Sequence, residues 1–171
     1  MDIKNLIRTI PDFPKPGIGF KDITPILSDG AALAWIVDGI SDRYRGRVDG
    51  VVGIESRGFI AGAPIAYCLG VGLTIARKPG KLPHTTHTVD FELEYGRDSL
   101  EMHTDALEKD SRVVVVDDLL ATGGTAKAAV ELVERSGARV VECAFIVELG
   151  FLGGAEKVSP VPCFSLVSYE E

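Results

Sequence analysis

The stretch that decides the fold class is VVVVDDLLATGGT, residues 113–125. Its four consecutive valines predict a strand buried on both faces, as in a parallel sheet. Asp117 and Asp118 come at the carboxyl end of this strand, where open α/β sheets bind their ligands. The turn that follows opens a helix, and amide groups at a helix N-terminus suit a phosphate. Carboxylates for hydroxyl groups beside an anion-binding turn together predict a sugar phosphate site.

The turn itself, called the phosphate loop below, consists of Ala121, Thr122, Gly123, Gly124 and Thr125. The glycines allow the main chain to approach an anion, and the threonines add hydroxyl donors. An ordinary strand-to-helix turn with two solvated acids is the simpler alternative. The acidic pair and the two threonines together favour the anion site. The Walker A pattern and the G-x-G-x-x-G pattern of nucleotide-binding loops are both absent.

Strand and helix patterns alternate along the rest of the chain. Strands are predicted at 51–54, 72–76, 112–116, 140–149 and 163–167. Helices are predicted at 3–10, after Ser28 or Asp29, at 59–69 with a late start or a kink at Pro64, and from the phosphate loop to Gly137. This order predicts an α/β fold with a doubly wound, mostly parallel sheet flanked by helices. The polar stretch 78–100 is expected to be a functional lid or a weak hairpin.

Length and composition fit one soluble domain spanning residues 1–171. The net charge of −7 argues against a nucleic-acid partner, because phosphate backbones select basic faces. Three cysteines far apart in sequence, without a C-x-x-C pair, fit a reducing compartment. The sequence shows no secretion signal and no apolar run long enough to span a membrane, so a cytoplasmic protein without a membrane partner is expected. The histidines lack metal-binding spacing, and no protein-ligated metal is expected.

A second polar turn, Glu55, Ser56 and Arg57, follows the strand predicted at 51–54. Its amide groups and the Arg57 guanidinium could hold a second anion through charge-assisted hydrogen bonds. An ion pair between Glu55 and Arg57 on a surface turn is the alternative. Its expected position beside the phosphate loop favours the anion site.

The polar stretch 78–100 and the residue before it contain further candidates. Arg77, Lys78 and Lys81 lie among glycine and proline, as in an anion clamp on a mobile loop, although a solvated basic loop is equally consistent. Glu94 could act as a general acid or base if the loop closes and excludes water, whereas most loop glutamates are simply solvated.

These motifs, in this order, resemble the type I phosphoribosyltransferases, and within them the branch that acts on adenine. The resemblance rests on residues 13–24, 55–59, 77–83, 93–96 and 115–125. It implies the type I phosphoribosyltransferase fold, with a small N-terminal hood within residues 1–30 and a flexible catalytic loop. It also implies a purine salvage reaction in which adenine and 5-phosphoribosyl-1-diphosphate (PRPP) give AMP and diphosphate. Mg²⁺ would be bound mainly by PRPP and water, and the enzyme would be a homodimer.

The same resemblance implies roles for the two anion sites. The phosphate loop would hold the ribose 5-phosphate, and Asp117 and Asp118 would bind the ribose hydroxyls. The turn at residues 55–57 would bind pyrophosphate through an unusual cis peptide, with Arg57 stabilising the leaving group. Arg77, Lys78 and Lys81 would close over the pyrophosphate.

For the base, the resemblance implies that Phe20 packs on adenine while the backbones of Gly19 and Lys21 read its edge. Glu94 would handle the proton on the adenine ring, and Tyr95 would contribute to substrate binding.

Two alternatives stay open from the sequence. The same reaction on hypoxanthine, guanine or xanthine is the nearer one, although enzymes for those bases tend to carry a different acidic motif before the phosphate loop. The other is a non-catalytic regulator that only senses the donor. The presence of Glu94 and the lack of an added DNA-binding domain disfavour a regulator.

Overall fold

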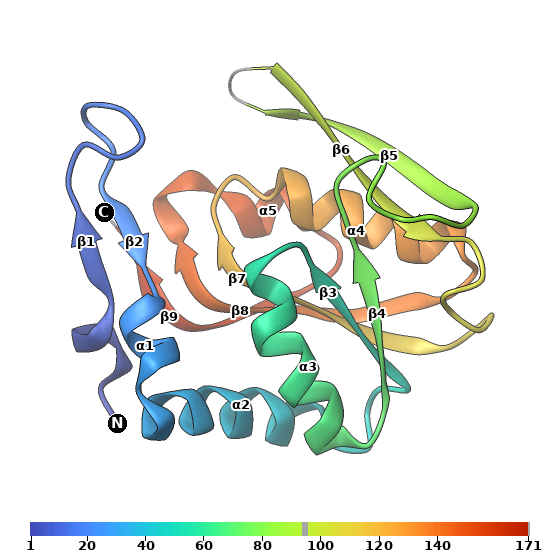
Figure 1. The fold of residues 1–171 in the computed structure, drawn as a ribbon, viewed down its shortest axis with the longest axis horizontal. Helices are drawn as coiled ribbons and strands as arrows, with labels where there is room; N and C mark the ends of the chain where they lie inside the picture. The colour runs from blue at the N-terminus through green and yellow to red at the C-terminus, as the bar shows by residue number, and fades with distance from the viewer. Residues whose placement is uncertain (94–95, 171) are drawn as a thin grey trace.

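The computed structural model describes residues 1–93 and 96–170. In these residues a five-stranded, all-parallel sheet with the order β4-β3-β7-β8-β9 forms the centre (Figure 1). Its members are β3 (Gly50–Ile54), β4 (Gly72–Ala76), β7 (Arg112–Leu120), β8 (Arg139–Leu149) and β9 (Cys163–Tyr169). The predicted parallel α/β sheet is confirmed.

Helices cover both faces of this sheet. The helices are α1 (Thr24–Ser28), α2 (Gly30–Tyr44), α3 (Arg57–Leu69), α4 (Gly124–Arg135) and α5 (Gly154–Val158). Val114 and Val116 of β7 belong to the core under α2 and α3, whereas Val113 and Val115 belong to the core under α4 and α5. All four valines are fully buried. The valine run is therefore apolar throughout because each face of β7 packs against a helical layer.

Two predicted boundaries were wrong. Strand β7 extends to Leu120, so the acidic pair lies in its last residues and not after its end. Pairing explains the extension, because Asp117, Leu119 and Leu120 continue the parallel register with β8. Helix α3 starts early, at Arg57, and contains Pro64. The predicted N-cap of α2 is right: the Asp29 carboxylate accepts hydrogen bonds from the amides of Ala31 and Ala32.

The N-terminal segment differs from the predicted helix at 3–10. A short 3₁₀ helix, η1 (Ile3–Leu6), is followed by β1 (Arg8–Ile10), which pairs antiparallel with β2 (Phe20–Asp22). A side-chain hydrogen bond also links the two strands, because the Asp22 carboxylate of β2 accepts a hydrogen bond from Arg8 of β1. In Figure 1 this small hairpin, called the hood below, stands beside the main sheet.

The polar stretch after β4 folds into a hairpin of β5 (Thr86–Leu93) and β6 (Gly96–His103), so the hairpin alternative is confirmed. Val89, Leu100 and Met102 are buried in the core that contains α4, and the hairpin lies over that helix (Figure 1). A second 3₁₀ helix, η2 (Gly150–Leu152), links β8 to α5. Among the described residues, no helix combines the length and apolar character that crossing a membrane requires.

Candidate active site

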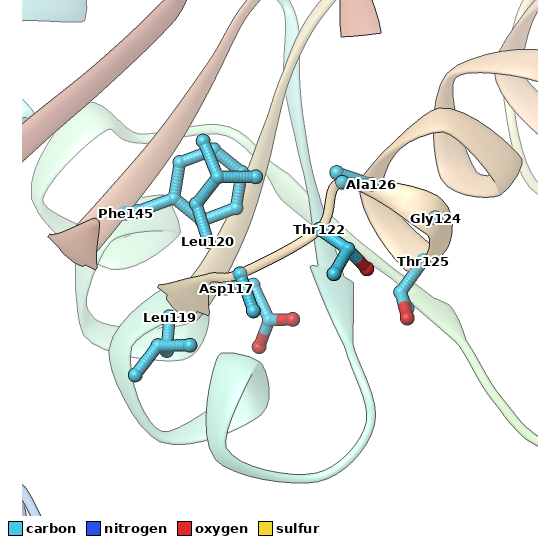
Figure 2. A pocket seen from close by; sticks show the side chains of 10 residues that line it. Asp117, Leu119, Leu120, Thr122, Gly124, Thr125, Ala126 and Phe145 are labelled. Atoms are coloured by element: carbon cyan, nitrogen blue, oxygen red, sulfur yellow. The ribbon is translucent and has the colours of Figure 1, made fainter. Parts of the chain in front are cut away.

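The phosphate loop joins β7 to α4 at the carboxyl end of the sheet. A small hollow of about 80 Å³ is lined by the whole loop together with Asp117, Leu119, Leu120, Ala126 and Phe145. Figure 2 shows the hydroxyl oxygens of Thr122 and Thr125 and the carboxylate of Asp117 on the same open side of the loop. Gly123 has a φ of +80°, which glycine adopts at little cost, and α4 begins at Gly124. The structure therefore brings the loop and the acidic pair together as the sequence predicted.

The two acids of the pair have different surroundings. Asp118 is buried and forms an ion pair with Arg57. Burial, and then the negative charge of Asp118, raise the pKa of Asp117 well above its ordinary value. The Asp117 carboxylate also accepts a hydrogen bond from the Asp118 amide at 2.8 Å. Asp118 thus lies beside a cation, while the surroundings of Asp117 favour the protonated form.

The turn at residues 55–57 packs directly against the acidic pair. Its Glu55–Ser56 peptide bond is cis, as the resemblance implied. A Cβ on Gly58 would lie 2.8 Å from the Val116 carbonyl oxygen and 3.0 Å from Asp117 Oδ1, so the backbone approach excludes larger residues. Arg57 then reaches Asp118. The turn at residues 55–57 and the acidic pair therefore lie together at the carboxyl end of the sheet.

The alternative ion pair between Glu55 and Arg57 is wrong. Glu55 Oε1 accepts hydrogen bonds from Arg77 Nε and Nη2, at 3.0 and 2.6 Å, and Oε2 accepts one from the Lys78 amide at 2.8 Å. The Arg77 hydrogen bonds hold the pKa of Glu55 below its ordinary value despite its burial. Glu55 therefore anchors the start of the basic segment to the turn, while Arg57 pairs through its Nε with Asp118.

The cations of the basic segment are not all equally accessible. Arg77 is held by Glu55 and by a backbone bridge to Glu101, and Lys78 forms an ion pair with Asp98 of β6. The Lys78 ammonium also lies 5.7 Å from the centre of the Phe91 ring. Lys81 is exposed. In this conformation two of the three predicted clamp residues are paired with carboxylates of the protein.

The hood brings an aromatic ring to the same site. Phe20 of β2 packs edge-on against Phe13 at 5.2 Å between ring centres, and Arg57 Cζ lies 5.9 Å from the centre of the Phe20 ring. The Lys21 ammonium donates a hydrogen bond to Thr9 Oγ1 at 3.0 Å and lies over the ring of Tyr169. Gly19 has no side chain, and the side chain of Lys21 is engaged away from the acidic pair.

The roles predicted for two residues of the lid stay untested. Glu94 and Tyr95 lie outside the described residues. Among the described residues, no group of three or more His, Cys, Asp or Glu side chains could hold a metal ion.

The sequence patterns missed two neighbours of the site. They are Asp98, the partner of Lys78, and Gly154, which packs on the phosphate loop. The only sequence signal for Gly154 was the Gly153-Gly154 pair after β8.

Known proteins resemble the chain over nearly its whole length. Residues 20–167 match the family described as Phosphoribosyl transferase domain. The adenine phosphoribosyltransferase of Roseiflexus sp. (strain RS-1) is 57% identical, with 98% of each chain covered. Among solved structures, the adenine phosphoribosyltransferase of Thermoanaerobacter pseudethanolicus has a TM-score of 0.95 at 50% identity, covering 98% of both chains. The Giardia lamblia enzyme complexed with 9-deazaadenine has a TM-score of 0.93 at 40% identity, covering 99% of this chain and 97% of that one. The chain belongs to the phosphoribosyltransferase family, with the type I fold that its motifs predicted.

Proposed function

We propose that this chain catalyses the adenine phosphoribosyltransferase reaction, in which adenine and PRPP give AMP and diphosphate. The observation that carries the proposal is the meeting of the phosphate loop, the acidic pair and Arg57 at one sheet edge, with Phe20 of the hood beside Arg57. Relatives named adenine phosphoribosyltransferase at 53–57% identity support the choice of base. The enzyme is a pentosyltransferase of purine salvage.

The assigned roles follow the charge that each group carries. The phosphate loop offers amide and hydroxyl donors to the 5-phosphate of the ribose. Asp118 and Asp117 orient the ribose hydroxyls, and the Asp118 carboxylate tolerates the positive charge that develops on the sugar. Arg57 and the amides of the turn containing Glu55 and Ser56 stabilise the departing pyrophosphate. Arg77, Lys78 and Lys81 add cations on that side, and Lys78 must exchange Asp98 for the substrate.

Mg²⁺ is the proposed cofactor. The donor set fits a metal held mainly by PRPP and water, because the acidic pair provides hard oxygen atoms at the ribose side of the site. When bound, Mg²⁺ would neutralise part of the charge that accumulates on the leaving pyrophosphate.

The base would bind between the hood and the acidic pair. Phe20 offers a ring face to adenine, and the backbones of Gly19 and Lys21 read its edge. Glu94 handles the proton on the purine ring, and Tyr95 contributes to substrate binding. Loss of Glu94 would slow turnover about 10²- to 10⁴-fold, the usual contribution of general acid–base catalysis.

We also infer a homodimer in the cytoplasm, with residues 1–171 forming one phosphoribosyltransferase domain that has no nucleic-acid or membrane partner. An apolar stripe on α3 supports the dimer: Ile60 is 46% and Tyr67 86% exposed, and Pro64 lies between them. Because α3 begins at Arg57, a partner on this stripe would lie near the active site. Sedimentation velocity at assay concentrations distinguishes a dimer from a monomer.

A purine assay tests the function directly. The purified protein is incubated with PRPP, Mg²⁺ and one base at a time: adenine, hypoxanthine, guanine or xanthine. Adenine should give AMP, and the other bases should give little or no nucleotide. Nucleotide formed only from another base would support the nearer alternative, and binding of PRPP without any product would support a regulator.

A further inference from the structure

We infer that helix α5 positions the phosphate loop, with Gly154 shaping the loop from behind and Lys157 adding positive charge beside it. This inference rests on the proposed role of the loop in holding the 5-phosphate. No sequence motif discussed above includes α5, which becomes a neighbour of the loop only through folding.

Contact between Gly154 and the loop is backbone to backbone. A Cβ on Gly154 would overlap the carbonyl oxygen of Ala121 and would come within 3.0 Å of two side-chain atoms of Leu120. From the other side, a Cβ on Gly123 would overlap the Gly154 carbonyl oxygen. The two glycines therefore interlock, and a single methyl group on either one would displace the loop.

Position 154 requires glycine because no space is left for a side chain. Gly153 differs, since its φ of +66° is a backbone conformation that favours glycine, whereas Gly154 is not among the residues with positive φ. Alanine could therefore adopt the backbone conformation of residue 154 without strain. The added methyl group would meet the Ala121 carbonyl, so Gly154→Ala acts on the loop and not on the local helix.

Lys157 lies one turn further along α5. Its Nζ is 3.7 Å from the position that a Cβ on Gly124, the first residue of α4, would occupy. Within the described part of the chain no carboxylate comes within ion-pair distance of this ammonium. A cation there adds to the positive end of the α4 dipole, where a phosphate dianion would sit.

The inference predicts an effect limited to ligands that carry a 5-phosphate. PRPP and AMP share that group, whereas pyrophosphate uses the turn at residues 55–57 and adenine uses the hood. Gly154→Ala should raise the KM for PRPP and, in the reverse reaction, the KM for AMP. The KM values for adenine and pyrophosphate should stay nearly constant, which a general loss of folding would not produce.

Steady-state kinetics in both directions tests this. Gly154→Ala should raise the KM for PRPP and AMP about 10- to 100-fold, because small misplacements at a site are costly. Gly30→Ala is the matched control, since nothing lies within 4 Å of a Cβ there. Unchanged KM values for PRPP and AMP in Gly154→Ala, or an equal rise for all four substrates, would overturn the inference.

Lys157→Met tests the charge without depending on the tight packing of Gly154. It should raise the KM for AMP about three- to tenfold, less at high salt because screening weakens the attraction. An unchanged KM for AMP would overturn the role of Lys157, and this test remains valid even if Gly154→Ala fails to fold.

The double variant Thr122→Ala with Thr125→Ala distinguishes a failure of the inference about α5 from a failure of the role proposed for the phosphate loop. If it weakens AMP binding while the α5 variants do not, the inference fails and the loop assignment stands; if it too has no effect, the loop assignment fails.

Discussion

Two neighbouring strands carry carboxylate sites, which are Glu142 of β8 and the acidic pair of β7. The two sites differ in how many hydrogen-bond and ion-pair partners they have inside the protein. Glu142 accepts hydrogen bonds from Arg43 Nε and Nη2 at 2.6 and 2.8 Å and from the Tyr44 hydroxyl at 2.7 Å. The Arg43 hydrogen bonds hold the pKa of Glu142 below its ordinary value although the residue is buried. A buried carboxylate with a full set of partners inside the protein stabilises the fold and leaves nothing for a ligand.

The acidic pair has the opposite balance. Among the described residues, Arg57 forms an ion pair with Asp118, and the pKa of Asp117 is raised by burial and by Asp118. Groups with such perturbed pKa values are concentrated at functional sites. The comparison indicates that burial alone does not distinguish the carboxylates available to substrate. They are distinguished by having few hydrogen-bond and ion-pair partners inside the protein.

Glu142→Gln should have the largest effect on stability. The substitution leaves Arg43 without its charged partner and the Tyr44 hydroxyl without its best acceptor. The free energy of unfolding should fall by about 2–3 kcal/mol, as for other buried polar groups that lose a partner. Chemical denaturation measures this loss. The exposed pair of Glu131 and Arg135 gives the control, because Glu131→Gln should cost less than about 1 kcal/mol. Equal costs for the two variants would contradict the structural role of Glu142.

Asp118→Asn should act mainly on catalysis. It removes a charged acceptor for the ribose and the partner that orients Arg57. kcat/KM for PRPP should fall about 10- to 100-fold, the value of one or two hydrogen bonds to a charged group. Stability should change little, because the Arg57 side chain is 45% exposed and can regain water. Initial rates at varied PRPP, with a denaturation curve on the same sample, separate the two effects.

The smallest effect is expected from Asp117→Asn, which should make the protein more stable at neutral pH. With its pKa raised in the folded state, Asp117 binds its proton more tightly there than in the unfolded chain, where the value is near 3.8. Stability therefore falls as the pH rises from the unfolded pKa through the folded one. The variant lacks this loss, so its advantage in Tm should grow from about pH 4 upward. An advantage that is constant with pH would show that burial does not destabilise the charged form.

The sequence allowed most of the sheet and several positions of the site to be predicted. The valine run identified the central strand because both of its faces are buried, and Asp29 identified the start of α2 by a local capping rule. The pairing of polar side chains could not be read in this way. Glu55 with Arg77, Arg57 with Asp118 and Lys78 with Asp98 are contacts across 20 to 61 residues, set by how separate loops meet.

The same limit explains the other errors. The segment at 8–10 becomes a strand because a partner strand arrives at 20–22, and a local helical pattern contains no sign of that partner. Gly154 looked like part of a loop because its requirement is the space occupied by Ala121, more than 30 residues earlier.

The most direct test of the account is the KM for PRPP of Asp118→Asn and Glu142→Gln, measured side by side at one pH and temperature. Both remove one negative charge from a buried carboxylate of the sheet. We predict a clear rise in KM for Asp118→Asn and a value close to that of the unchanged protein for Glu142→Gln. A rise of similar size in both, or a rise in Glu142→Gln alone, would contradict the claim that the carboxylates with few partners inside the protein are the ones that bind the ribose.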